Sequence, residues 1–370
     1  PPKPAGHLRI ATLGGSTVLG VPDGQLGFVH QLEQTLRPLA RQPLDFLNLA
    51  RSGAGSNSVA ESLEHALAAE ADLVLVLTGH NEFLAARPTE GWRGTLQRVR
   101  DRSFLATGIG RWLEEGNPPR EPAFPDTIEP VDPNGAQAKA IRRNFERNLT
   151  RIVARTQEAG VSLVLLTAPA NLSEWPPAHR RVAWRPSRPR FESDVAALHR
   201  LIDSGDAAEA LRALRNEPPA APDDATIRYL EGRALVGVGR PQEARLAFTR
   251  ARDRDPIPRR ALTSFNQLVR SHAHAPHITL VDLATHFEQI ATSGLVGLEL
   301  IADNCHPTPL GGAHIAEQVT RALGDADLVL RRGVRVPSAD AIHRTTQRAL
   351  GNAAKQRSVH VRWLLSNAIY

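Results

Sequence analysis

Five short apolar runs, separated by longer segments with helical periodicity, constrain the fold of this 370-residue chain more than any other feature. The runs are Leu8–Leu13, Leu44–Leu49, Asp72–Leu77, Val161–Thr167 and Ile278–Leu283. The third is apolar at every position after its first, as a strand covered on both faces requires. Apolar residues at helical spacing predict helices over Gly27–Arg41, Asn57–Ala69, Lys139–Gly160 and Pro309–Leu323. Strands that alternate with helices predict an α/β fold built on a doubly wound, parallel, five-stranded sheet.

The composition is that of an ordinary globular protein, with 41% hydrophobic and 23% charged residues. A net charge of +6 and a pI of about 10.3 raise the question of a nucleic-acid partner. Only Lys3, Lys139 and Lys355 are lysines, and the many arginines are interleaved with acidic residues rather than gathered beside aromatic side chains. We therefore expect no nucleic-acid partner.

Cys305 is the only cysteine, which excludes an intrachain disulfide and a multi-cysteine metal cluster. No apolar run reaches the length of about 20 residues that a membrane-spanning helix needs. The chain begins Pro-Pro-Lys-Pro without a methionine, so an upstream leader or anchor stays open. We expect a soluble domain whose compartment is unassigned; an extracytoplasmic or membrane-tethered location is compatible with the sequence.

Four short blocks carry the residues of chemical interest, and they occur in the order Leu13–Thr17 (LGGST), Asn48–Gly53 (NLARSG), Thr78–Glu82 (TGHNE) and Asp303–His306 (DNCH). Each of the first three follows a predicted strand, at the end of the sheet where ligands of α/β proteins bind. Alone, Gly-Gly-Ser-Thr is also compatible with a tight turn and a helix cap. A nucleotide-binding loop is disfavoured because neither Gly-x-Gly-x-x-Gly nor the P-loop lysine is present.

This order of blocks resembles the SGNH hydrolases, also called the GDSL family of esterases and lipases, over residues 8–83, 139–172 and 258–323. The resemblance implies a flavodoxin-like sheet and a catalytic set of Ser16 as nucleophile, His306 as base and Asp303 as the group that orients the base. The oxyanion hole would combine the backbone N–H groups of Ser16 and Gly53 with the side-chain amide of Asn81. No cofactor and no metal are implied.

The chain departs from the family pattern at several positions. Gly15 stands where an aspartate usually precedes the serine, and Glu82 stands where an aspartate usually follows the asparagine. His80 either lines the site or is a hydrogen-bonded bystander, and Cys305 is interpreted as a packing residue. Two further segments, Pro169–Leu172 and Arg259–Arg260, either border the substrate pocket or have helix-dipole or surface roles.

The predicted organisation is a hydrolase core interrupted twice. Residues 1–84, 139–190 and 258–323 form the core, the last part with Asp-x-x-His; residues 85–138 form a helical cap or lid, and 324–370 a C-terminal extension. Residues 191–257 contain an internal repeat, because Gly205–Ala210 recurs as Gly239–Ala244 at an offset that resembles a tetratricopeptide helix pair. This insertion is interpreted as a structural helical hairpin, with a platform for a partner or substrate as the alternative.

These observations predict a serine esterase or acyl hydrolase that acts on a small acyl ester, in particular an O-acetyl ester of a carbohydrate, through an acyl-serine intermediate. An O-acyltransferase with the same triad is one alternative. A catalytically silent scaffold that binds a protein partner through residues 191–257 is another.

Overall fold

The computed structural model describes residues 2–21, 23–85, 130–177, 189–216 and 223–349. Its centre is a five-stranded sheet in which every neighbouring pair is parallel, in the order β2-β1-β3-β4-β5. The strands are β1 (Leu8–Gly14), β2 (Leu44–Asn48), β3 (Leu73–Leu77), β4 (Ser162–Leu166) and β5 (Ile278–Val281). This order is that of flavodoxin-like doubly wound sheets, so the predicted fold class is confirmed.

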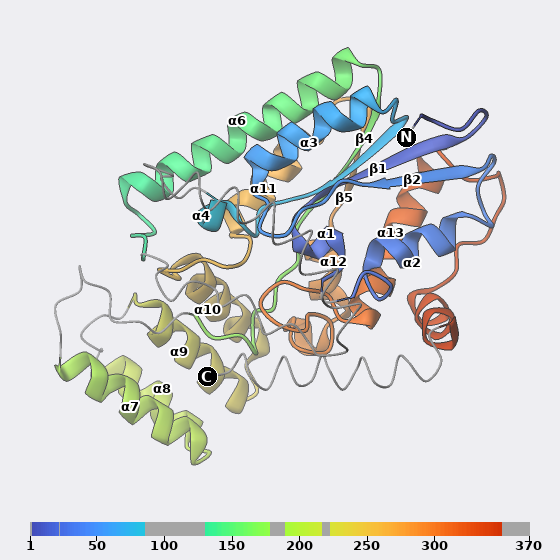
Figure 1. Ribbon diagram of the computed structural model, residues 1–370. Helices are drawn as coiled ribbons and strands as arrows, with labels where there is room; N and C mark the ends of the chain where they lie inside the picture. The colour runs from blue at the N-terminus through green and yellow to red at the C-terminus, as the bar shows by residue number, and fades with distance from the viewer. Residues whose placement is uncertain (1, 22, 86–129, 178–188, 217–222, 350–370) are drawn as a thin grey trace, which may run out of the picture.

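Alternation along β3 explains why helices cover both faces of the sheet. Leu73, Leu75 and Leu77 belong to one buried cluster, whereas Val74 and Val76 belong to another. The first cluster takes in apolar residues of α2 (Phe28–Leu36), α12 (Leu283–Ile290) and α13 (Pro309–Asp325). The second takes in those of α3 (Ser56–Ala68), α6 (Ala136–Glu158) and α11 (Thr263–His272). Figure 1 shows α3 and α6 on one side of the sheet, and α2 and α13 on the other.

The helices begin and end within a few residues of their predicted bounds, except that α2 stops at Leu36 and not at Arg41. Pro38 explains the difference because it has no backbone N–H with which to continue the helical hydrogen bonds. The chain instead turns, and Ala40 forms an isolated antiparallel bridge with Leu330.

Four helices, α7 (Pro189–Asp203), α8 (Ala207–Asn216), α9 (Ala225–Gly237) and α10 (Pro241–Asp253), form a unit with its own apolar cluster. A close contact joins α9 to α10, where a Cβ on Gly232 would lie 2.6 Å from the Phe248 ring. The unit rests on the core through Tyr229, which donates a 2.8 Å hydrogen bond to the Ser173 carbonyl, and through the Arg245–Glu288 ion pair. We call these four helices the helical unit.

The predicted cap falls mostly on residues 86–129, and the end of the predicted C-terminal extension on 350–370; both ranges lie outside the described residues. α4 (Glu82–Ala85) leads toward the first range, and α6 begins at Ala136. Within the described part of the chain, no helix combines the length and the apolar character needed to cross a membrane.

Candidate active site

Ser16 lies where β1 gives way to a short helix. The strand ends at Gly14, and α1 (Ser16–Leu19) begins with the serine itself, after Gly15 in an extended conformation. Because β1 lies between β2 and β3, the loops that follow those two strands flank the serine. Ser16 is thereby placed at the carboxyl edge of the sheet, next to the loops that carry Gly53 and Asn81.

The side chains of Ser16, His306 and Asp303 form one hydrogen-bonded row. His306 Nε2 lies 2.7 Å from Ser16 Oγ, and His306 Nδ1 lies 2.6 Å from Asp303 Oδ2. A carboxylate beside Nδ1 selects the tautomer with its proton on Nδ1, which leaves Nε2 as the acceptor that faces the serine hydroxyl. This arrangement can remove the proton from Ser16 as the hydroxyl attacks a carbonyl carbon.

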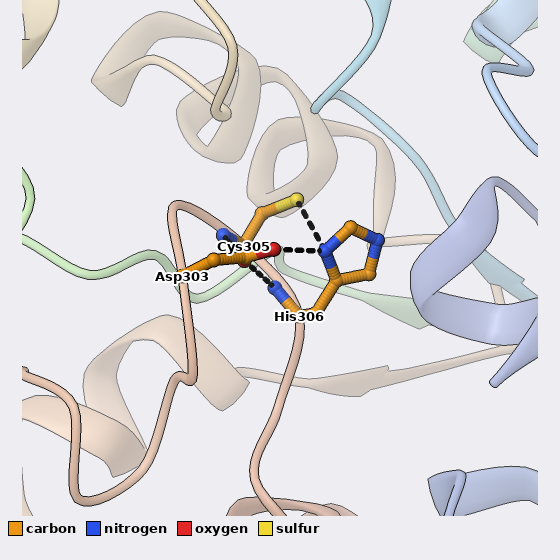
Figure 2. A group of neighbouring side chains, drawn as sticks. All are labelled: Asp303, Cys305 and His306. Carbon is orange, nitrogen blue, oxygen red and sulfur yellow. Dashed lines mark hydrogen bonds and ion pairs between the residues drawn. The ribbon is translucent and has the colours of Figure 1, made fainter. Parts of the chain in front are cut away.

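The Asp-x-x-His turn fixes its own carboxylate. Asp303 Oδ1 accepts hydrogen bonds from the backbone N–H groups of Cys305 and His306, both at 2.8 Å, while Oδ2 faces the imidazole (Figure 2). Burial alone raises the pKa of Asp303, but the hydrogen bonds and charge of His306 outweigh burial and lower it. Asp303 therefore stays an anion beside the ring.

His306 itself is largely enclosed, with a side chain 17% exposed. Burial by itself lowers the pKa of this imidazole, but interactions with Cys305 and with the Asp303 carboxylate outweigh burial and raise the pKa well above its usual range. The ring therefore binds a proton more strongly than a free imidazole does, and it can act as a base toward Ser16 only in its neutral form.

Further hydrogen bonds hold the Asp303–His306 turn against the neighbouring loops. The Asn304 side chain donates to the Arg259 carbonyl, and the Asn304 carbonyl accepts from the Asn171 backbone N–H at 3.2 Å. The Arg260 guanidinium donates to the Asn171 carbonyl, and Arg260 is only 2% exposed. Burial lowers the pKa of Arg260 to about 10. Asn171 and Arg260 are therefore buried supports of the turn and not surface residues.

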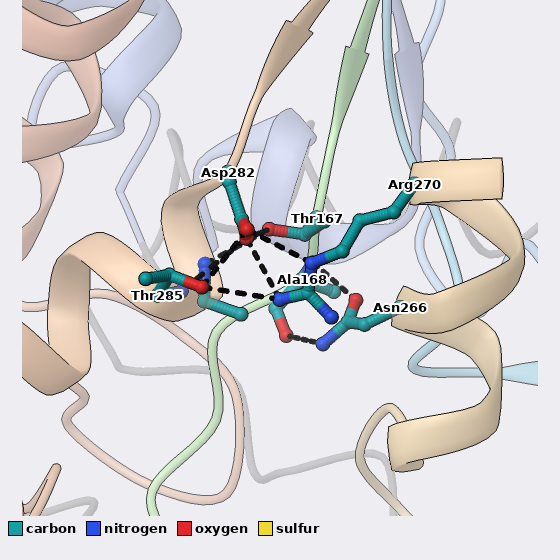
Figure 3. A network of polar contacts seen from close by, with 7 residues as sticks. Thr167, Ala168, Asn266, Arg270, Asp282 and Thr285 are labelled. Atoms are coloured by element: carbon teal, nitrogen blue, oxygen red, sulfur yellow. Dashed lines mark hydrogen bonds and ion pairs between the residues drawn. The ribbon is translucent and has the colours of Figure 1, made fainter. Parts of the chain in front are cut away.

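The ends of β4 and β5 are joined by a polar network centred on Asp282 (Figure 3). Its carboxylate accepts hydrogen bonds from Thr167 and Arg270, each at 2.8 Å. Burial alone raises the pKa of Asp282, but the hydrogen bonds, first that of Arg270, lower it to about 2. Asn266 pairs with both backbone groups of Ala168, through bonds of 2.8 and 3.0 Å. This network holds the start of the loop that reaches Asn171.

The Asn81 side chain lies against the residue that precedes the serine. Its amide nitrogen donates to the Ala54 carbonyl at 3.1 Å and would lie 2.6 Å from a Cβ on residue 15. Gly15 is therefore required for this close approach. Gly53 has a φ of 71°, in the left-handed region that glycine adopts without strain, and lies one residue before Ala54. The loops that carry Gly53 and Asn81 thus meet beside Ser16.

His80 is buried as a neutral ring. Its Nδ1 accepts a 3.1 Å hydrogen bond from the backbone N–H of Ala261, and burial, followed by the positive charge of His306, lowers the pKa to about 3. Cys305 is also buried, with Sγ 3.9 Å from His306 Nδ1. His80 therefore fits the bystander interpretation. Cys305 is buried as a packing residue would be, and it also contacts the His306 ring and helps to raise the pKa of His306.

Asp303, Cys305 and His306 place their donor atoms within 4.8 Å of one another, which makes them a candidate metal-binding group in the described part of the chain. Two ligands of one tetrahedral zinc ion lie about 3.3 Å apart, given metal–ligand distances near 2.0 Å. The 2.6 Å separation of Asp303 Oδ2 and His306 Nδ1 is shorter and is that of a charge-assisted hydrogen bond. A metal on Nδ1 would also leave a proton on Nε2, so the ring could not act as a base toward Ser16. The geometry fits proton transfer better than metal binding.

The chain matches no family model and no curated protein. Among solved structures, it is similar to a lipase/acylhydrolase from Enterococcus faecalis, with a TM-score of 0.43 and 9% identity over 88% of this chain and 100% of that one. A lipase from a goat rumen metagenome gives a TM-score of 0.40 and 12% identity over 85% of this chain and 97% of that one. An acetyl xylan esterase gives a TM-score of 0.39 and 11% identity over 85% and 100%. These likenesses are distant, so any function must be argued from the residues of this chain.

Proposed function

We propose that this protein is a serine esterase of the SGNH type that hydrolyses small acyl esters, in particular O-acetyl esters of carbohydrates. The observation that carries the proposal is the row Ser16–His306–Asp303, with its 2.7 and 2.6 Å separations. A neighbouring base makes a serine hydroxyl nucleophilic at neutral pH, and a carboxylate that orients this base completes a catalytic triad. The preference for a small acyl group follows from the family resemblance of Gly-Gly-Ser-Thr.

In the proposed mechanism, Ser16 Oγ attacks the ester carbonyl while His306 Nε2 takes the hydroxyl proton. The negative oxygen of the tetrahedral intermediate accepts hydrogen bonds from the N–H groups of Ser16 and Gly53 and from the Asn81 amide, each worth about 3 kcal/mol by comparison with other hydrolases. His306 then gives its proton to the leaving alcohol, and an acyl-serine remains. Water attacks that ester with His306 again as base, which releases the acid.

The same acyl-serine would serve an O-acyltransferase if an acceptor alcohol displaced water. Two further expectations remain part of the proposal. They are the predicted domain boundaries, including those of the cap, and the tetratricopeptide character of the helical unit. The close α9–α10 contact at Gly232 favours a structural role for the unit, since it is the kind of packing that stacked helix pairs need. A scaffold without activity would instead capture a partner through the unit and turn over no ester.

The test is hydrolysis of p-nitrophenyl acetate, butyrate and octanoate by the purified chain, together with labelling by a fluorophosphonate. Turnover that is fastest with acetate, and a single label on the peptide that contains Ser16, would support the proposal. Added alcohols that divert acyl groups from water to ester products would indicate the transferase. An inert chain that also fails to take the label would contradict the proposal.

The rate is expected to rise with pH through a value above the ordinary histidine pKa of about 6.5, because only neutral His306 accepts the proton of Ser16 and its pKa is raised. The contribution of His306 to the free energy of unfolding should instead fall as pH rises. A raised pKa means that the His306 proton stabilises the folded state below the unfolded pKa, and that this contribution is lost as pH rises through the folded pKa. The measurements are kcat/KM from pH 5 to 9 and the denaturant midpoint of wild type beside His306→Gln. A rate already maximal at pH 5.5 would contradict this expectation.

Gly15→Ala is expected to lower kcat by about 10- to 100-fold, the loss that a displacement of roughly 1 Å causes in a catalytic site. The added methyl group would lie 2.6 Å from the Asn81 amide nitrogen, so the amide must move. Gly24→Ala is the matched control, because a Cβ there meets only the Leu19 carbonyl at 3.8 Å. The assay is initial-rate hydrolysis of p-nitrophenyl acetate. Equal rates for the two variants would show that the close approach of residue 15 and Asn81 does not matter for catalysis.

A further inference from the structure

We propose that Glu82 is a positioning residue, whose carboxylate ties the loop that carries Gly53 to the loop that carries Asn81 and so sets the separation of these two oxyanion donors. The inference rests on the proposed function and extends it to a residue that takes no part in proton transfer. Glu82 follows Asn81 directly and is the first residue of α4. It is 4% exposed.

The Glu82 carboxylate accepts hydrogen bonds from both loops. Oε1 accepts the backbone N–H of Ser56 at 2.9 Å and the Thr78 hydroxyl at 3.3 Å, and Oε2 accepts the Ser56 hydroxyl at 2.7 Å. Ser56 is the first residue of α3 and lies three positions after Gly53. The carboxylate therefore bridges the start of α3 and the end of β3.

The orientation of the Ser56 hydroxyl is fixed from a third element. Asn148 of α6 donates a 2.9 Å hydrogen bond to Ser56 Oγ, so the proton of that hydroxyl is directed to Glu82. A carboxylate is also favoured at the N-terminus of α3, where the helix dipole is positive. The directed Ser56 hydroxyl and the helix dipole both favour the ionised form of the Glu82 carboxyl group, although burial raises its pKa.

The two loops are packed closely enough for this tie to control the site. A Cβ on Gly55 would lie 2.8 Å from the Ala85 Cβ, and the Asn81 amide donates across the same gap to the Ala54 carbonyl at 3.1 Å. A change in the length of the Glu82 bridge would therefore move Asn81 relative to Gly53. Glu82→Asp shortens the bridge by about 1.5 Å, the length of one C–C bond.

The experiment compares Glu82→Gln, Glu82→Asp and Ser56→Ala with wild type in p-nitrophenyl acetate hydrolysis. Glu82→Gln places an amide N–H₂ against donors, and we expect it to lower kcat by about 30- to 100-fold with KM changed less than twofold. The Ki of a trifluoromethyl ketone, which forms a tetrahedral adduct with the serine, should rise by the same factor as kcat falls. Ser56→Ala keeps the backbone donor and should cost about tenfold or less.

A double-mutant cycle distinguishes a positioning role of Glu82 from a merely structural role. If Glu82 acts through Asn81, Glu82→Gln should cost less than threefold in an Asn81→Ala background, because the positioned group is already gone. Glu317→Gln is the matched control, since Glu317 is also buried and holds a backbone N–H, that of Ala339, at 2.8 Å, but lies on α13. It should leave kcat within twofold of wild type.

Three outcomes would overturn the inference: kcat within twofold of wild type in Glu82→Gln, an unchanged Ki for the ketone, or equal losses with and without Asn81. If Glu82→Gln does not fold, Glu82→Asp and Ser56→Ala answer the same question. The failure of the proposed function is distinct, because then wild type itself would neither turn over esters nor take the fluorophosphonate label, and the inference would fall with it.

Discussion

Replacement of Ser16 by alanine is expected to lower kcat for p-nitrophenyl acetate by about 10⁶-fold, the loss found when the nucleophile of a serine protease is removed. The methyl group cannot form the acyl intermediate, while the groups that bind the ester remain, so KM should change little. His306→Ala should cost nearly as much, and the double variant no more than either, because the two side chains act as one unit. Initial rates and active-site titration measure these losses.

The control for that series is Ser271→Ala, which removes an exposed hydroxyl of α11 that donates to the Leu268 carbonyl and lies 3.4 Å from His272 Nδ1. It should retain wild-type kcat and the fluorophosphonate label. A Ser16→Ala protein that keeps more than a few per cent of wild-type kcat, or that still takes the label, would refute the assignment of the nucleophile.

Asp303→Asn is expected to lower kcat by about 10⁴-fold, as the same change does in a serine protease triad. An amide N–H₂ that faces His306 Nδ1 favours the tautomer with its proton on Nε2, and that nitrogen then cannot accept the proton of Ser16. The loss of the carboxylate also removes a cause of the raised His306 pKa, so the acid limb of the residual rate should move to lower pH. The measurement is kcat/KM against pH.

Asp282→Asn provides the comparison for that variant. Asp282 is another carboxylate with a lowered pKa, but it lies between the ends of β4 and β5 and contacts Thr167 and Arg270. We expect this change to lower the thermal midpoint and to leave the position of the acid limb unchanged. An Asp303→Asn enzyme with the wild-type acid limb would show that His306 is not the group that titrates.

The sheet and the row of polar side chains could be anticipated from the sequence for the same reason. A buried parallel strand leaves a run such as Leu73–Leu77 that is apolar throughout, and the residues that follow such a run must lie at the carboxyl edge. Ser16 and Asn81 are therefore placed near each other by topology alone. Asp303 and His306 follow no predicted strand directly, and the resemblance of their Asp-x-x-His turn to the SGNH family pattern indicated them.

Contacts between loops could not be anticipated in this way. Nothing in the local pattern indicates that Gly15 is needed because Asn81 approaches it, or that Glu82 reaches Ser56, 26 residues earlier. Arg260 is the clearest case, because arginine is rarely buried and a surface or pocket position was a natural expectation. Its burial beneath the loop of Asn171 depends on a partner 89 residues away in the chain.

The separation of the two halves of the site has a consequence for how this protein acquires activity. Ser16 and His306 are 290 residues apart, so their contact closes a loop that spans most of the described chain. Such non-local contacts form late, since the entropy of loop closure must be overcome before they contribute. The helical unit, by contrast, is held by contacts between neighbouring helices. During refolding from denaturant, helical circular dichroism should therefore return before ester hydrolysis, and during synthesis the nucleophile leaves the ribosome long before its base exists. The proposed esterase activity would thus report the completion of folding.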